Sequence, residues 1–220
     1  MKEVEIGTRI LSDNERQVAL NREYFKSSGV TVINLIGSPG SGKTTILERT
    51  FRDLSERVRF AVIEGDLETD HDALILRKTG VPVEMINTHG ACHLNAAQIR
   101  GAAEKLDMEN TDILIIENIG NLVCPSSFEL GENFKLGVLS TPEGDEKPVK
   151  YPELFVRARA VAVSKLELAE LVRFDMDKAR EGLLRCNPDI EVFPMSVFTG
   201  EGWDVWCDWI TGLAENNQSI

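Results

Sequence analysis

A glycine-rich segment in the first quarter of the chain carries the residue types that bind phosphate. Gly37 is followed after four residues by Gly42, Lys43 and Thr44, between an apolar run and a stretch with helical spacing. This is the P-loop pattern in its usual context. Glycines let main-chain N–H groups turn toward phosphate oxygens, the lysine adds positive charge, and the threonine hydroxyl faces Mg²⁺. The sequence therefore predicts a nucleoside triphosphate site. Its predicted contacts here are Gly37, Gly40, Ser41, Gly42, Lys43, Thr44 and Thr45.

Acidic residues come at the ends of two later apolar runs. Asp66 ends FAVIEGD, and Glu117 follows DILII. The carboxyl ends of strands face the phosphates in a doubly wound sheet, and Mg²⁺ takes a few carboxylates and otherwise keeps water. We expect Thr44, Asp66 and Glu117 to approach Mg²⁺, and Lys43 and Asp66 to act in catalysis, Asp66 by orienting water. The alternative is that each acid caps the next helix.

The segment AVAVSKLELAE is positioned to read the base. A guanine site typically has Asn-Lys-x-Asp, whereas this chain has Ser164, Lys165, Leu166 and Glu167. We expect the Lys165 stem to pack on the purine and Glu167 to accept from guanine N1 and N2, with weaker discrimination against adenine because Ser164 replaces the bracing Asn. Ser196, in MSVFTGEG, is predicted to offer the base a main-chain contact. The alternative is a strand that runs into a helix with surface charges.

Cysteine and histidine residues follow two of the apolar runs, one of them the run that leads to Glu117. Cys92 adjoins His93, and Cys124 lies seven residues after Glu117. Thiolate and imidazole suit Zn²⁺ or Ni²⁺, but three ligands leave a tetrahedral site one short. Water, His89 or a cysteine of a second chain would complete it. Ordinary buried cysteines would show the same spacing.

The elements that must position these residues can be read from the apolar runs. Short, β-branched, nearly continuous runs alternate with helical text, which is typical of strands buried on both faces of a parallel sheet. We predict an α/β fold, a P-loop NTPase with a doubly wound, mostly parallel sheet flanked by helices and an N-terminal lead helix from a cap at Ser12 to about Gly29. The expected divisions are 1–29, a helical extension; 30–215, the P-loop domain; and 216–220, a tail. The seven runs are VTVINLI, VRFAVIEGD, VPVEMIN, TDILIIEN, LGVLST, AVAVS and IEVFPMS.

Composition excludes several classes of function. Lys and Arg number 24 against 36 Asp and Glu, a net charge of −12, so a nucleic-acid backbone is not an expected partner. No stretch approaches the roughly 20 apolar residues of a membrane helix, and the start lacks a secretory pattern. A cytoplasmic protein with reduced cysteines is therefore expected.

Several blocks of the text are similar to the HypB family, GTPases that help insert nickel into hydrogenases. They are IGSPGSGKTT, VIEGDLETDHDA, INTHGACHLNA, IIENIGNLVCPSSFELGE and LSTPEGDEKPVKYPELF, and the similarity runs from about residue 30 to 210. The resemblance implies a slow, Mg²⁺-dependent GTPase that forms a homodimer around its nucleotides. It also implies a Zn or Ni site at the dimer interface, formed by Cys92, His93 and Cys124 and coupled to GTP. The implied partners are an accessory protein of the HypA type and the hydrogenase large subunit.

The chain departs from the family pattern at two places. The base motif carries Ser164 and Glu167, and the metal loop reads HGACHLN, which lacks the family's Lys and Asp and gains His89. The first 30 residues hold neither a cysteine motif nor a histidine tract, so nickel storage is not predicted. The alternatives are a P-loop small-molecule kinase or ATPase that prefers adenine, a urease-type nickel GTPase, and a regulatory binding module.

Overall fold

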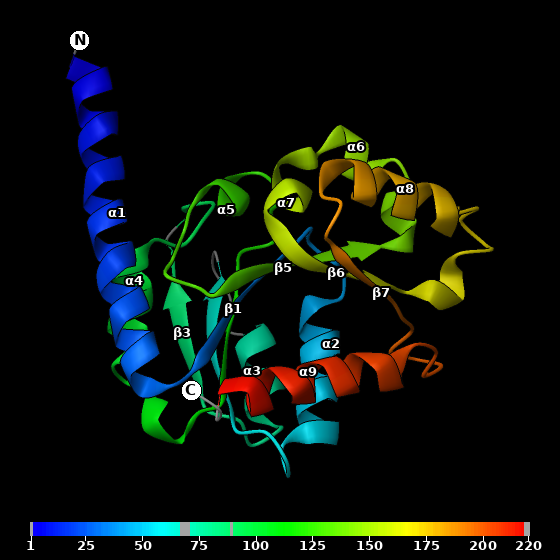
Figure 1. The fold of residues 1–220 in the computed structure, drawn as a ribbon, viewed down its shortest axis with the longest axis horizontal. Coiled ribbons are helices and arrows are strands. Elements are labelled where there is room, and N and C mark those ends of the chain that lie inside the picture. The colour runs from blue at the N-terminus through cyan, green and yellow to red at the C-terminus, as the bar shows by residue number, and fades with distance from the viewer. Residues whose placement is uncertain (1, 67–70, 89, 218–220) are drawn as a thin grey trace.

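The computed structural model describes residues 2–66, 71–88 and 90–217, with side chains described from residue 13 to 215 except at 66–70 and 89 (Figure 1). Within these ranges seven strands form one parallel sheet in the order β3-β2-β4-β1-β5-β6-β7. Each strand falls in one of the seven apolar runs, so the predicted doubly wound sheet is confirmed. The strands are β1 (Thr31–Gly37), β2 (Phe60–Asp66), β3 (Val83–Asn87), β4 (Ile113–Glu117), β5 (Phe134–Ser140), β6 (Ala158–Ser164) and β7 (Glu191–Pro194).

Helices cover both faces of this sheet. The α-helices are α1 (Lys2–Ser28), α2 (Lys43–Leu54), α3 (His71–Arg77), α4 (Ala96–Ala103), α5 (Cys124–Ser127), α6 (Lys147–Lys150), α7 (Pro152–Arg157), α8 (Met176–Cys186) and α9 (Trp203–Asn217). Short 3₁₀ helices are η1 (Met108–Asn110), η2 (Thr141–Glu143) and η3 (Leu166–Leu168).

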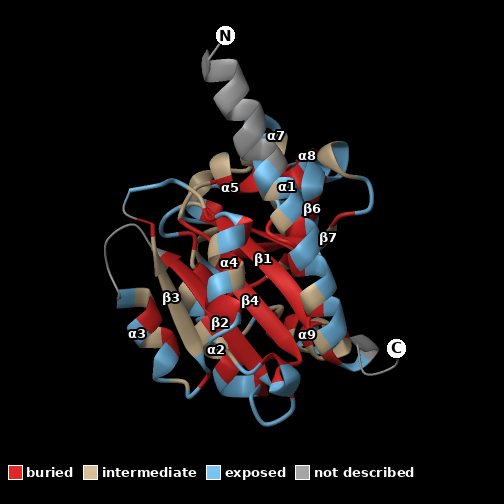
Figure 2. Cartoon of the chain, turned by 90° about the vertical axis from the view of Figure 1, so that its left-hand side faces the viewer, coloured by how far each residue is buried: buried red, intermediate tan, exposed pale blue. Residues whose placement is uncertain are grey.

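The core lies in two layers separated by the sheet. Every residue of β1 and β4 is buried, as expected for strands covered on both sides (Figure 2). On one face, Ile33 and Leu35 pack with Phe51 of α2 and Trp206 of α9. On the other face, α1 and α4 cover one half of the sheet and α7 and α8 cover the other half.

The lead helix is longer than predicted. Helix α1 begins at Lys2 rather than at Ser12, and it ends at Ser28 before Gly29, whose φ is +66°. The ten residues from Lys2 to Leu11 contain no proline, so nothing in the chain stops the helix at Ser12. The proposed domain divisions stay predictions, although α9 continues to Asn217, into the segment assigned to the tail.

The loops that leave the strands gather at one edge of the sheet. Because all the strands are parallel, the segments after β1, β2, β4 and β6 emerge at the same edge, and this is where α/β sheets bind ligands. No helix in the described part of the chain is both long and apolar enough to span a lipid bilayer.

Candidate functional site

The P-loop lies between β1 and α2. Gly42 caps α2 with φ +96° and ψ 17°, a left-handed conformation that favours glycine. Lys43 is the first helical residue and is 8% exposed, and its ammonium donates to the carbonyls of Gly37 and Ser38 at 3.4 Å each. The lysine charge is therefore held across the inside of the loop, where phosphate oxygens bind in sites of this type.

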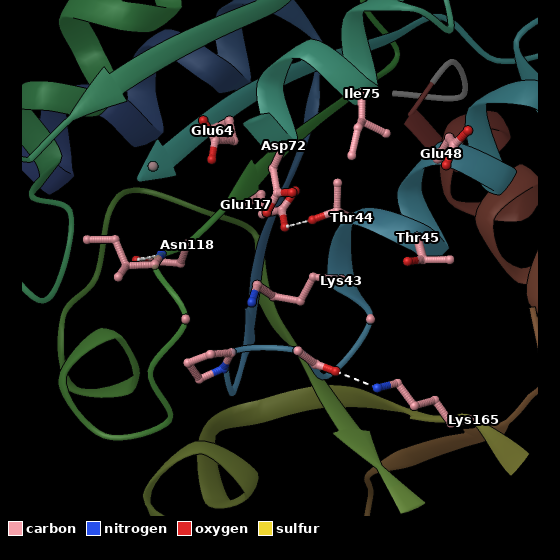
Figure 3. Close-up of a pocket in the computed structure, with 16 residues that line it drawn as sticks. Lys43, Thr44, Thr45, Glu48, Glu64, Asp72, Ile75, Glu117, Asn118 and Lys165 are labelled. Atoms are coloured by element: carbon pink, nitrogen blue, oxygen red, sulfur yellow. Dashed lines mark hydrogen bonds between the residues drawn. The ribbon is translucent and has the colours of Figure 1, made fainter. Parts of the chain in front are cut away.

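A cavity of about 440 Å³ lies beside the P-loop. Figure 3 shows Thr44 and Glu117 facing each other there, and the Thr44 hydroxyl donates to Glu117 Oε1 at 2.8 Å. These oxygens are the hard ligands that Mg²⁺ prefers. Asp72, at the start of α3, also lines the cavity. Asp66 ends β2, but its side chain lies outside the described residues, so its predicted role stays a prediction.

Two polar residues of this cavity were not predicted. Glu64, in the middle of β2, is 3% exposed, and Asn118 follows Glu117 and is 2% exposed; both line the cavity. A carboxylate inside an otherwise apolar run was the sequence signal for Glu64. Asn118 also ties the end of β4 to β1, because its amide donates to Asn34 Oδ1 on β1 at 3.1 Å.

A second cavity of about 420 Å³ adjoins the first. Gly42, Thr45 and Lys165 line both cavities, so one elongated ligand can occupy the two together. The Lys165 ammonium donates to the Gly40 carbonyl at 2.6 Å (Figure 3), and Lys165 has φ 59°. Glu167 is exposed and lines this second cavity, where we expected the base-reading acid.

The bracing role that we expected Ser164 to lose is retained. Its buried hydroxyl donates to the Ser41 carbonyl at 2.6 Å, which joins the end of β6 to the P-loop. A hydroxyl is shorter than the amide of Asn, but the close approach of the two segments lets it reach. Ser164 therefore still braces the loop through this hydrogen bond, and the expected weaker discrimination against adenine stays a prediction.

The turn after β7 lines the second cavity with two residues that were not predicted, while the predicted main-chain contact of Ser196 with the base stays a prediction. Ser196 is fully buried, its N–H donates to the Glu201 carbonyl at 2.9 Å, and its hydroxyl accepts from Thr199 N–H at 2.9 Å. The walls of the second cavity are instead Val197 and Phe198, the latter 89% exposed. Ser196 thus stabilises the turn through hydrogen bonds within it. An aromatic side chain in a polar turn was the signal for Phe198 that the sequence analysis passed over.

The two predicted cysteine ligands meet within one chain. Cys92 is exposed, and Cys124 begins α5. A hydrogen bond with the Cys124 thiol raises the pKa of Cys92, and burial adds to this rise. Cys92 Sγ also lies 3.6 Å from His93 Nδ1. Among the described residues, no group of three His, Cys, Asp or Glu side chains is arranged to hold a metal ion. His89 lies outside the described residues.

The His93 ring is fixed by an aromatic neighbour. It stacks on Phe128, with centroids 3.9 Å apart and planes at 13°, and burial lowers the pKa of His93. The neutral imidazole is the form that binds metal. Two thiols and this ring are donors of the type that suits Ni²⁺ or Zn²⁺, and one chain leaves the coordination shell to be completed by other ligands.

Both thiol-bearing segments pack against the walls of the phosphate cavity. A β-carbon at Gly120, in the loop that leads to Cys124, would lie 3.0 Å from Pro39 Cγ of the P-loop. A β-carbon at Gly65 of β2 would lie 2.8 Å from Leu94, which follows His93 and is fully buried. The walls of the phosphate cavity and the two thiol-bearing segments therefore touch at two places.

Comparison with known proteins identifies a matching family and similar proteins. The family model "CobW/HypB/UreG, nucleotide-binding domain" matches residues 31–194. The chain is 45% identical over 210 residues to hydrogenase maturation factor HypB of Escherichia coli (strain K12), covering 96% of this chain and 72% of that protein. It is 44% identical over 201 residues to hydrogenase/urease maturation factor HypB of Helicobacter pylori (strain ATCC 700392 / 26695), covering 89% of this chain and 81% of that protein.

Two solved structures have the same fold. The crystal structure of HypB from Helicobacter pylori in complex with nickel matches with a TM-score of 0.88 and 40% identity, covering 93% of this chain and 96% of that one. HypB from Archaeoglobus fulgidus matches with a TM-score of 0.86 and 35% identity, covering 92% and 99%.

Proposed function

Since the chain belongs to the CobW/HypB/UreG nucleotide-binding family, we propose that it is a GTP-binding, slowly GTP-hydrolysing switch that assists nickel insertion into a [NiFe]-hydrogenase. The resemblance noted in the sequence blocks is thereby confirmed at the level of the family. The observation that carries the proposal is the loop 118–123. It begins beside Glu117, packs on Pro39 of the P-loop, and ends at Cys124, whose thiol meets that of Cys92.

The two adjoining cavities support a nucleotide laid across the P-loop. The triphosphate lies over Lys43 and Thr44, and the base enters the second cavity beside Lys165 and Glu167. Glu167 accepts hydrogen bonds from the guanine edge, whereas the adenine edge offers a donor and an acceptor in a different pattern. Mg²⁺, held by Thr44 and Glu117 with Asp66, supplies charge neutralisation at the phosphates.

Slow hydrolysis fits the composition of the phosphate cavity. Lys43 stabilises charge, and Asp66 orients the attacking water. The described residues that line this cavity include no arginine and no glutamine, the side chains that accelerate other GTPases. A low intrinsic rate suits a switch that must hold its triphosphate state long enough to transfer cargo.

Nickel is the cargo in this proposal, and Cys92, His93 and Cys124 are its ligands. Two thiols and one imidazole fall short of four ligands, so a second copy of the chain completes the shell in a homodimer. The GTP and GDP states place loop 118–123 differently, which changes the affinity of the thiols for metal. Delivery then involves an accessory protein of the HypA type and the hydrogenase large subunit.

The test is rescue of hydrogenase activity in Escherichia coli cells that lack their own HypB. The wild-type chain restores nickel content and activity of the hydrogenase, whereas Lys43→Ala and the Cys92→Ala/Cys124→Ala double variant do not. In vitro, phosphate release with Mg²⁺ is competed by GDP and not by ADP. Rescue by both variants, or equal competition by ADP, would overturn the proposal and favour the adenine-dependent alternative.

A further inference from the structure

We infer that helix α1 holds the two thiol-bearing segments at a fixed separation, with Asn14 and Asn21 as positioning residues. The thiols lie on segments that leave the sheet, and no strand joins them directly in the described residues. Their relative position must therefore be fixed by side-chain contacts. The consequence for nickel rests on the function proposed above, but the positioning itself does not.

Asn21 bridges the two segments with one amide group. It is fully buried, and its Nδ2 donates to the Ala96 carbonyl at 2.8 Å and to the Leu130 carbonyl at 2.7 Å. Its Oδ1 accepts from Gln17 at 3.1 Å. Ala96 lies four residues after Cys92, and Leu130 lies six residues after Cys124. Both amide protons are used, one on each segment.

Asn14 repeats this bridge two helical turns earlier on the same face. Its Oδ1 accepts from Ala96 N–H at 3.1 Å, and its Nδ2 donates to the Glu129 carbonyl at 3.2 Å. Arg22 pairs with the Glu129 side chain, although that pair is more than half exposed and adds little. Four backbone groups of the two segments are therefore bound by two asparagines of one helix.

The packing around these bonds is close. Gly131 has φ +98°, and a β-carbon there would lie 2.5 Å from Asn21 Cβ, so the loop backbone rests directly on α1. On the other segment, α1 lies along α4 (Figure 2), and the Arg100 guanidinium sits 4.0 Å from the centroid of the Tyr24 ring. Val18 and Phe25 of α1 are buried at this interface.

The hydrogen bonds to α1 matter for the proposed metal site because they set the positions of the sulfur and nitrogen donor atoms. Metal–ligand distances tolerate errors of only a few tenths of an ångström. The segment that α1 binds at Glu129 and Leu130 also carries Phe128, the stacking partner of His93. Displacing it from α1 changes the Cys92 to Cys124 separation and the His93 orientation together. Outer partners of this kind typically alter metal affinity by about 10- to 100-fold.

The experiment compares Asn14→Ala with Asn187→Ala in the full chain. Asn187 is a matched control, because its Nδ2 donates to the Ala158 carbonyl at 2.9 Å and its Oδ1 accepts from Asp189 N–H at 3.0 Å, and neither bond involves α1 or a segment that α1 binds. The first readout needs no metal: it is the equilibrium constant for forming the Cys92–Cys124 disulfide in mixtures of reduced and oxidised glutathione. Mass spectrometry of the peptides measures the fraction of disulfide. The second readout is Ni²⁺ affinity by chelator competition. Thermal unfolding and GDP affinity are measured alongside.

We expect Asn14→Ala to lower the effective concentration of the two thiols by at least about fivefold, and Asn187→Ala to change it by less than about twofold. Asn14→Asp keeps the acceptor for Ala96 and loses the donor to Glu129, so it gives an intermediate value and serves if the alanine variant does not fold. Ni²⁺ affinity falls in the same order by about tenfold.

Equal effects of Asn14→Ala and Asn187→Ala on the thiol equilibrium would overturn the inference, since α1 would then contribute stability only. A lowered thiol equilibrium would support it even if wild-type protein bound Ni²⁺ no more tightly than the Cys92→Ala/Cys124→Ala variant. That second result would instead refute the proposed metal function.

Discussion

The Thr44 hydroxyl donates a hydrogen bond to Glu117 Oε1 at 2.8 Å, joining the first turn of the P-loop helix to the end of β4. Thr44 is the residue expected to face Mg²⁺, and Glu117 immediately precedes the loop that ends at Cys124. We therefore expect a change of partner at Thr44 to alter the position from which this loop starts. The contact of Gly120 with Pro39 gives the same loop a second point of attachment to the phosphate site.

Gly120→Ala tests whether that attachment reaches the thiols. The new methyl would lie 3.0 Å from Pro39 Cγ and 3.1 Å from Pro39 N, so the loop must shift by a few tenths of an ångström. We expect Ni²⁺ affinity to change by about five- to tenfold, at the low end of the usual coupling between sites, while GDP affinity changes less. Gly101→Ala is the control, since nothing lies within 4 Å of its added carbon. Identical Ni²⁺ affinities in the two variants would argue against the contact route.

Glu167→Ala tests the reading of guanine. Loss of its paired hydrogen bonds is expected to cost about 1–3 kcal/mol, or about 5- to 150-fold in GTP affinity, and to leave ATP affinity unchanged. Glu170→Ala, exposed in the same segment, is the control. Isothermal titration with each nucleotide measures both affinities. If the variant lost GTP and ATP affinity equally, Glu167 would not be the base-reading residue.

Phe198→Ala tests the wall of the second cavity that the sequence analysis passed over. The 89% exposed ring lines this cavity, and stacking of a base on an aromatic ring contributes about 1–3 kcal/mol. GDP affinity should fall by about 5- to 150-fold, whereas competition by pyrophosphate, which has no base, should not change. Leu171→Ala, at an 81% exposed side chain that does not line the cavity, should alter neither value. Equal losses for GDP and pyrophosphate would show that Phe198 acts on the fold instead.

Lys135→Met tests the buried ion pair between Lys135 and Glu132. Burial raises the pKa of Glu132, but the Lys135 ammonium and hydrogen bonds from Lys135, Asn34 and Leu130 outweigh it, so this pKa lies below 4.5. In the wild type, the free energy of unfolding should therefore fall as pH drops below 4.5. Without the cation, burial dominates and the pKa of Glu132 rises. In the variant, the contribution of Glu132 to the unfolding free energy should therefore fall as pH increases above 4.5.

The same substitution should destabilise the fold by about 3–5 kcal/mol at pH 7, because it leaves a buried charge without its partner. Urea unfolding between pH 3.5 and 7.5 measures both effects. Lys105→Met, which breaks the surface pair with Glu84, should change neither the stability nor its pH dependence appreciably. If the difference in unfolding free energy between wild type and Lys135→Met did not grow as pH rises above 4.5, the role given to Lys135 at Glu132 would be wrong.

The sequence predicted the strands and the P-loop because both have strong local signals. Each β-branched run became a strand, and Gly42 to Thr44 fixes the start of α2. The helix start at Lys2 was missed, since a serine that can cap a helix does not have to do so. Local pattern is therefore informative about the type of an element and less so about its ends.

Contacts between distant segments could not be read from the chain. Ser164 reaches Ser41 across 123 residues, and Phe198 lines the second cavity from a turn whose side-chain directions the sequence does not record. The predicted main-chain contact of Ser196 with a base stays a prediction. Cys92 and Cys124 lie together although they come from separate loops, and the hydrogen bonds from Asn21 of α1 to both segments have no signal in the sequence. Such relationships arise from packing, which spacing along the chain does not record.

We propose that the nucleotide bound at the P-loop changes the metal affinity of Cys92 and Cys124. This is tested by measuring the Ni²⁺ affinity of the full chain with GDP and with a non-hydrolysable GTP analogue, each with Mg²⁺. We expect the two affinities to differ by at least about fivefold, a coupling of about 1 kcal/mol, and the difference to disappear in the Cys92→Ala/Cys124→Ala variant. Equal Ni²⁺ affinity in both nucleotide states would contradict this proposal.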